Sequence, residues 1–119
     1  CDLNLPFRPQ DAADQAGRAK EALAHYEACI RTRGEDTNTL LLYGNAAAEA
    51  LDTDLAMSLF DRAIASAPKM GRPHMSKGKL LLFLKKREEA GVELLEAIKL
   101  DPSLDEARNY LMKLTGNGR

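Results

Sequence analysis

The chain has 119 residues, of which 45% are hydrophobic and 29% charged, and its formal net charge is −1 at pH 7. This length leaves room for one domain with a modest core, and the nearly balanced charge argues against a nucleic-acid binder, which normally carries a basic surplus. No apolar run approaches the roughly 18 residues that a membrane-spanning helix needs, so the sequence predicts no membrane span.

The first stretch, residues 1–8, is predicted to be extended, because prolines at positions 6 and 9 disfavour a regular helix. The chain begins with Cys1 instead of methionine, and its opening "CDLNL" resembles the start of a mature bacterial lipoprotein, whose first cysteine carries the lipid. Two interpretations of the localisation stay open. The protein is cytoplasmic by default if Cys1 is an arbitrary boundary, and lipid-anchored if Cys1 is a processed N-terminus.

Residues 9–36 are predicted to form a divergent helical unit. Their apolar residues recur in alternating steps of four and three, which is the spacing of an amphipathic helix. Residues 18–33 are the expected second helix of this unit, and Gly17 lies where a turn would precede it. A hairpin that turns at Gly17 is slightly favoured over one long helix with a weak point there, and both remain open.

Residues 37–70 are predicted to form a pair of helices. Thr37 or Asn38 is the expected cap of the first helix, and Thr53 or Asp54 that of the second. Side chains of these types accept hydrogen bonds from the backbone N–H groups that a helix leaves unpaired at its start. A proline at position 68 ends the second helix near residue 67, because proline cannot continue it.

Residues 71–103 are predicted to form another pair of helices, one from residue 72 to about 84 and one from residue 87 to about 100. Residues 104–119 predict a last helix and a tail. Ser103 is suited to cap this helix, and Asp105 and Glu106 to its first turn, where the helix dipole favours negative charge.

The two helix pairs repeat one pattern at a spacing of 34 residues, carried by "YGNAAAEALDTDLAMSLFDRAIASAP" and "KGKLLLFLKKREEAGVELLEAIKLDP". A period of this length, with glycine, alanine and proline at fixed offsets, is typical of a helix–turn–helix repeat. The pattern resembles the tetratricopeptide repeat family. The coinciding positions are Gly44 with Gly78, Ala56 with Ala90, Phe60 with Leu94, Ala63 with Ala97, Ile64 with Ile98, and Pro68 with Pro102.

The resemblance implies an all-α fold, a right-handed solenoid of antiparallel helix pairs in a single domain over residues 1–119. It would hold two full repeats, at 37–70 and 71–103, a divergent N-terminal repeat at 9–36 and a capping helix in 104–119. Stacking of the pairs would supply the core, because no pair buries its apolar face alone.

Close packing is predicted at the repeated glycines. A glycine within a helix costs about 1 kcal/mol relative to alanine, so Gly44 and Gly78 are expected to admit a neighbouring helix, against Ala56 and Ala90. Lys77 occupies a column that normally packs inward, and its alkyl stem is expected to lie along the core edge with the amine in water.

No catalytic or metal-binding constellation is recognisable, so the sequence predicts no enzyme, no cofactor and no metal site. His74 stands in a column that packing residues usually fill, which favours a structural histidine. Glu88, Glu89 and Glu93 are interleaved with cations, which is typical of a solvated helix face.

The resemblance also implies a binding site, because the first helix of each tetratricopeptide unit lines a groove that holds peptides or helices of partners. Two asparagines can hydrogen-bond an extended backbone, Met75 offers an adaptable apolar contact, and Arg72 with Lys79 favours an acidic segment. The alternative is that all these side chains are merely solvated. The candidate groove residues are Asn38, Leu41, Asn45, Arg72, Met75, Lys79 and Asn109, with Ala48, Leu82 and Lys113 beside them.

One subfamily binds the carboxylate tails of heat-shock chaperones through a fixed set of Lys, Asn, Asn, Lys and Arg. The matching columns here keep one fitting residue in either possible alignment, so no such clamp is expected. The sequence therefore predicts a non-enzymatic adaptor or scaffold for a protein or peptide partner, without nucleic acid. Self-association, or a place within a longer solenoid, is the alternative, and an enzyme is the outsider.

Overall fold

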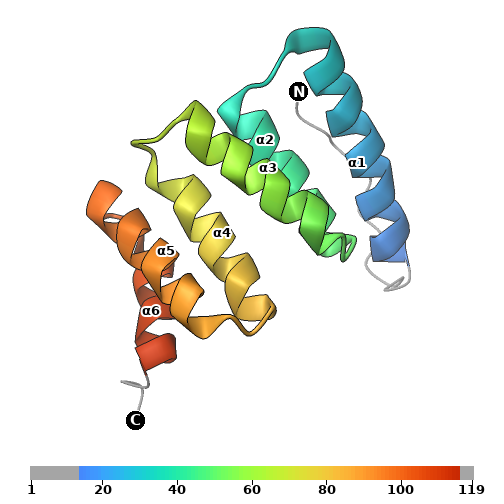
Figure 1. Cartoon of the computed structure of the whole chain (residues 1–119). Coiled ribbons are helices and arrows are strands. Elements are labelled where there is room, and N and C mark those ends of the chain that lie inside the picture. Colours follow the sequence, from blue (N-terminus) through green and yellow to red (C-terminus); the bar gives the residue numbers. More distant parts are fainter. Residues whose placement is uncertain (1–13, 116–119) are drawn as a thin grey trace. The chain divides into compact units, whose positions relative to one another are not determined.

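The computed structural model describes the backbone of residues 14–115 and the side chains of residues 19–115. Within this range the chain is all α (Figure 1) and falls into two compact units that meet in sequence between Ser66 and Ala67. The N-terminal unit holds α1–α3 and the C-terminal unit α4–α6. The helices are α1 (Asp14–Arg33), α2 (Thr37–Glu49), α3 (Thr53–Ser66), α4 (Gly71–Phe83), α5 (Arg87–Leu100) and α6 (Asp105–Thr115).

The helix boundaries follow the repeat period of the sequence. Helices α2, α4 and α6 begin at residues 37, 71 and 105, and α3 and α5 begin at residues 53 and 87, so equivalent helices start 34 residues apart. Within the N-terminal unit α2 pairs with α3 and α1 packs on α2; within the C-terminal unit α4 pairs with α5 and α6 packs on α5 (Figure 1). The predicted antiparallel helix pairs are confirmed.

Helix α1 differs from the favoured expectation for its part of the chain. It continues without a break from Asp14 through Gly17 to Arg33, so the predicted turn at Gly17 is wrong. From residue 19 onward one face of α1 is buried at helical spacing, as at Ala22 and Tyr26. That burial outweighs the roughly 1 kcal/mol that one glycine costs a helix. Residues 9–13 and the segment that opens with Cys1 lie outside the described range.

The repeated glycines admit a large side chain of the paired helix. A Cβ atom on Gly44 would lie 2.5 Å from Cε1 of Phe60, and one on Gly78 would lie 2.9 Å from Cγ of Leu94. Gly78 also approaches Ala90 as expected, whose carbonyl oxygen would lie 3.4 Å from the added Cβ, whereas the three atoms nearest to a Cβ on Gly44 all belong to the Phe60 ring. The alanine columns are fully buried as predicted, at Ala56, Ala63, Ala90 and Ala97.

Two aspartates cap the helices of the first pair, each one position before the helix begins. The carboxylate of Asp36 accepts a hydrogen bond from the backbone N–H of Thr39 at 3.3 Å, and that of Asp52 accepts one from Leu55 at 3.3 Å. The caps predicted inside the helices are wrong. An N-cap residue is not helical itself, and Asp36 has the extended backbone that lets its side chain reach the third N–H group.

The turn within each helix pair has the same unusual backbone. Leu51 and Lys85, which are equivalent in the repeat, have φ angles of 64° and 63°, in the left-handed region that favours glycine. The N–H of Leu51 donates to the carbonyl oxygen of Ala48 at 3.0 Å, and Asp52 donates to Ala47 at 2.8 Å. This is the Schellman pattern of helix ends.

The same pair of hydrogen bonds ends α4. The N–H of Lys85 donates to the carbonyl oxygen of Leu82 at 2.9 Å, and the N–H of Lys86 donates to that of Leu81 at 2.9 Å. Both turns therefore hold an L-residue in a conformation that costs such residues free energy.

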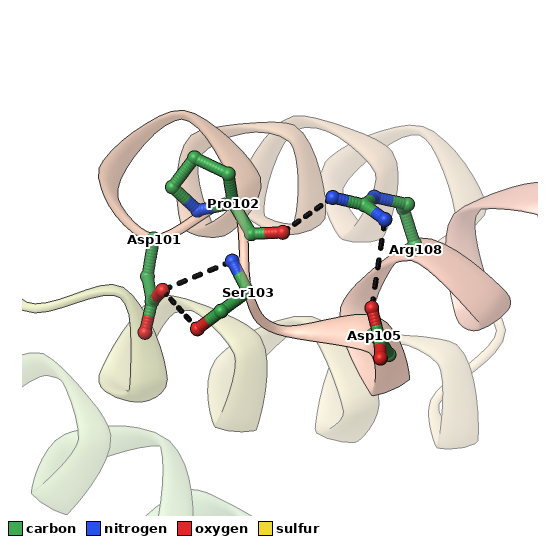
Figure 2. A network of polar contacts seen from close by, with 5 residues as sticks. All are labelled: Asp101, Pro102, Ser103, Asp105 and Arg108. Carbon is green, nitrogen blue, oxygen red and sulfur yellow. Dashed lines mark hydrogen bonds and ion pairs between the residues drawn. The ribbon is translucent and has the colours of Figure 1, made fainter.

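A polar network links α5 to α6 (Figure 2). The carboxylate oxygen Oδ1 of Asp101 accepts hydrogen bonds from the hydroxyl of Ser103 at 2.6 Å and from its backbone N–H at 3.1 Å. These two bonds, the hydroxyl first, hold the pKa of Asp101 below its ordinary value. The hydroxyl of Ser103 therefore donates to Asp101 and does not cap α6 as predicted. Arg108 donates to the carbonyl of Pro102 and lies 3.5 Å from Asp105.

Candidate functional site

The candidate groove residues of the N-terminal unit all lie on α2. Asn38 and Asn45 are exposed, so their amides are available to a partner. Leu41 is buried and contributes to the core of its unit. This part of the candidate site therefore offers two polar side chains and no accessible leucine at position 41.

In the C-terminal unit, Arg72 is exposed but Met75 is not. Only 8% of the Met75 surface is accessible, and its side chain belongs to a core cluster with Leu94, Ala97 and Ala107. The expectation that Met75 offers an exposed apolar contact is wrong. The equivalent residue one repeat earlier, Leu41, is buried as well, so this column faces the core in both helix pairs, and around Met75 the apolar surface comes from α5 and α6.

Lys79 is already paired with a carboxylate of its own unit. Its Nζ lies 3.0 Å from Oε2 of Glu106 on α6 and 5.7 Å from the centre of the Tyr110 ring. The ring attracts cations through its negative face. Asn109, also on α6, is exposed. An acidic group arriving at Lys79 from outside would therefore compete with Glu106.

A second polar cluster joins α4 to α5 at positions where the sequence predicts a solvated face. Nδ1 of His74 lies 2.7 Å from Oε1 of Glu93, and Nζ of Lys77 lies 3.8 Å from Oε2 of the same carboxylate. The side chains of His74 and Glu93 are only 14% and 20% exposed. The structural role expected for His74 agrees with this geometry, but the placement of Glu93 on a solvated face is wrong. Sequence spacing within α5 alone gives no sign that α4 brings an imidazole and an ammonium group to it.

The C-terminal unit also contains a pocket that was not predicted from the sequence. Its volume is about 520 Å³, and it lies where the end of α4, the start of α5 and α6 meet. Leu82 and Lys113 were expected beside the groove, but the other lining residues were not. The spacing of the run Lys85–Arg87 suggests a short basic stretch and nothing more; the turn at Lys85 and the return of α6 bring the six lining side chains together. They are Leu82, Lys85, Arg87, Tyr110, Lys113 and Leu114.

The described residues contain no group of three His, Cys, Asp or Glu side chains placed to hold a metal ion. None of the helices in residues 14–115 is both long and apolar enough to cross a membrane. The accessible side chains among the candidate groove residues offer hydrogen bonding by the amides of Asn38, Asn45 and Asn109 and attraction of negative charge by Arg72 and Lys79.

Comparison with known proteins agrees with the repeat pattern. Residues 72–104 match the tetratricopeptide repeat family. The chain is 32% identical over 85 residues to an Arabidopsis thaliana protein named "Inactive TPR repeat-containing thioredoxin TTL3". That alignment covers 71% of this chain but only 12% of the length of the plant protein.

Solved structures share the fold at low sequence identity. The first tetratricopeptide domain of Spaghetti (RPAP3), bound to the HSP90 peptide SRMEEVD, matches with a TM-score of 0.76 and 22% identity, over 85% of this chain and 80% of that one. The Yersinia enterocolitica type III secretion chaperone SycD, in complex with a peptide of the translocator YopD, matches with a TM-score of 0.70 and 20% identity, over 86% and 78% of the two chains. With its 34-residue helix pairs and the family match over α4 and α5, the chain is a member of the tetratricopeptide repeat family.

Proposed function

We propose that the chain is a non-enzymatic adaptor that holds a peptide segment of a partner protein along the first helices of its repeats. The observation that carries this proposal is the exposure of Asn38 and Asn45 on α2 and of Arg72 on α4. Asn38 and Arg72 are equivalent in the repeat, as are Asn45 and Lys79. Polar side chains thus recur at the same columns of a fold whose solved relatives Spaghetti and SycD hold peptides.

The chemistry of these residues suits an extended peptide. A side-chain amide carries both a donor and an acceptor, so each asparagine can hydrogen-bond a peptide backbone without requiring a particular side chain. The guanidinium of Arg72 adds an attraction for a carboxylate. In this proposal the two units act together as one domain over residues 1–119, and the chaperone-tail clamp is absent because its columns are not filled.

The experiment begins with crosslinking of the chain in its native host, followed by mass spectrometry to identify the bound segment. Affinity of that segment is then measured by calorimetry for a groove variant, Asn38→Ala with Asn45→Ala and Arg72→Glu. We expect at least about a tenfold loss, since each lost hydrogen bond or charge pair is worth about 0.5–1.5 kcal/mol. The thermal melt should change little, because all three side chains are exposed.

The control is Glu88→Lys with Glu89→Lys, two exposed residues at the start of α5. These substitutions should leave the affinity within about twofold. If the partner still binds the groove variant but no longer binds the α5 variant, the binding surface lies on α5 and the proposal is refuted. Glu93 is unsuitable as a control because it lies against His74.

Self-association is the second candidate, and the exposed apolar residues of α5 favour it. Val92 and Leu95 both present large apolar surfaces to solvent. Such residues contribute to protein interfaces when they cluster. Light scattering across a hundredfold range of concentration tests this: a constant monomer mass excludes self-association, and a mass that rises with concentration but not after Val92→Ser and Leu95→Ser supports it.

A further inference from the structure

The pocket of the C-terminal unit combines an apolar wall with a basic rim. Leu82, Tyr110 and Leu114 supply the apolar surface, and Lys85, Arg87 and Lys113 supply three cationic groups. The pocket volume of about 520 Å³ lies within the range that usually holds a small ligand or one large side chain with its neighbours. The pocket therefore suits an occupant that is apolar at its centre and negative around it.

Within residues 19–115, the cationic groups of this rim have no carboxylate partner. Among the described residues, no carboxylate lies within ion-pair distance of Lys85, Arg87 or Lys113. Arg87 donates one hydrogen bond to the carbonyl oxygen of Leu114 at 3.2 Å, and Nζ of Lys113 lies 5.8 Å from the centre of the Tyr110 ring. Both contacts position a cation at the rim without cancelling its charge.

The rim contrasts with Lys79 on α4. Lys79 also lies beside the Tyr110 ring, but its charge is balanced by Glu106. The ring of Tyr110 thus has an ammonium group near it from α4 and another from α6, and only the one from α4 is paired with a carboxylate among the described residues.

We infer that this pocket receives a bulky apolar side chain of a partner peptide that is flanked by acidic residues. The inference rests on the proposed peptide-binding function and names the kind of segment bound. The three cations come from three elements, the turn after α4, the start of α5, and α6. Because the cations come from separate elements, several acidic side chains around one apolar residue can pair with them individually, which suits the rim better than a single terminal carboxylate.

The test uses a synthetic probe in which one phenylalanine stands between two pairs of glutamates, with both peptide ends blocked so that no terminal carboxylate is present. Binding to the whole chain is followed by nuclear magnetic resonance and by fluorescence anisotropy. We expect saturable shifts at Leu82, Tyr110 and Leu114. Replacing the phenylalanine of the probe by serine, or its glutamates by glutamines, should weaken binding at least about fivefold.

Two matched double variants decide whether the rim is responsible. Lys85→Glu with Lys113→Glu reverses two cations of the pocket, and Lys86→Glu with Lys99→Glu reverses two exposed lysines that do not line it, for the same change in net charge. We expect about a tenfold or greater loss of affinity in the first variant and less than about a twofold loss in the second. Equal losses would show nonspecific attraction and overturn the inference, as would the absence of saturable binding.

These outcomes are separable from those of the proposed function. If the partner found by crosslinking depends on Asn38, Asn45 and Arg72 but the acidic probe does not bind the pocket, the pocket inference fails and the adaptor function stands. If the probe binds the pocket while the partner ignores the groove variant, the groove assignment fails and the pocket inference stands. A version of the probe with a free C-terminus that binds much more tightly than the blocked one would overturn the preference for acidic side chains.

Discussion

His74 and Glu93 are joined by a hydrogen bond, 2.7 Å between Nδ1 and Oε1, at the repeat positions that Leu40 and Leu59 fill one repeat earlier. Leu40 and Leu59 are both fully buried. The same two columns of the repeat thus hold two leucines in the first helix pair and a polar pair in the second, where Lys77 approaches the same carboxylate. The apolar contact of the first pair is thus replaced by a polar contact in the second, with one changed residue on each of α4 and α5.

The first prediction is a coupling between these two residues. Glu93→Leu alone leaves His74 without its carboxylate partner and should reduce the free energy of unfolding by about 1–2 kcal/mol. The double variant His74→Leu with Glu93→Leu should recover most of this loss, or be more stable than the parent protein. An apolar pair of similar size often replaces a buried polar pair without loss of stability. Urea denaturation of both single variants and of the double variant gives the coupling energy. If the stability losses of the single variants simply add up in the double variant, the two residues are not coupled and the prediction is wrong.

The second prediction concerns the close contact between Gly44 and Phe60. Gly44→Ala should destabilise the protein by about 1–3 kcal/mol, because the added methyl group would overlap a ring that is almost fully buried and cannot move aside. Gly91→Ala is the control: its added Cβ would meet only Cδ1 of Leu114, at 3.8 Å, so it should stabilise α5 by up to about 1 kcal/mol. Thermal melts that shift in the same direction for both variants would be inconsistent with this packing.

The third prediction concerns the left-handed residue Leu51. Its side chain is 71% exposed, so Leu51→Gly removes almost no buried surface while relieving the unfavourable φ angle. The relief of about 1–2 kcal/mol exceeds the entropic cost of a glycine, about 0.5–1 kcal/mol, and a net gain of about 0.5–1 kcal/mol should raise the melting temperature. Ser58→Gly, exposed within α3, should lower it. No gain at Leu51 would mean that the turn relaxes in solution.

The fourth prediction concerns pH. The pKa of Asp101 is lowered mainly by the hydroxyl of Ser103, so the folded state favours the ionised carboxylate. Its contribution to stability is therefore present above the ordinary aspartate pKa of 3.8 and is lost as the pH falls through the lowered value of the folded state. Ser103→Ala should raise the Asp101 pKa toward 3.8, as followed by carboxyl carbon resonances, whereas Ser58→Ala should leave it unchanged. An unaltered Asp101 titration in Ser103→Ala would refute the assignment.

Much of the fold could be predicted from the sequence because the repeat constrains it at many positions at once. The coincidence of Gly44 with Gly78 and of Pro68 with Pro102 fixes the period, and the period fixes where the helices of both pairs begin. The single helix through Gly17 was left open beside a slightly favoured hairpin, because local propensity at one glycine says little about the burial of a whole face.

The candidate site was less predictable, because exposure depends on which neighbour covers a column. Met75 stands at a groove position by sequence and yet lies in the core, because α5 and α6 enclose it. Glu93 looks like a surface residue along α5 and becomes half-enclosed only when His74 and Lys77 approach it from α4. Contacts between helices decide both cases, and spacing within one helix does not contain that information.

The left-handed backbone at Lys85 implies a trade-off between stability and recognition. As argued for Leu51, a glycine at position 85 would suit the left-handed backbone better. It would also remove an ammonium group from the pocket that Lys85 lines. If that group binds acidic segments, Lys85→Gly should yield a protein that melts at a higher temperature and binds the blocked acidic probe less well. A higher melting temperature together with weaker probe binding would show that the chain keeps a strained residue at position 85 because its side chain contributes to binding. If the melting temperature and the affinity rise or fall together, that explanation is wrong.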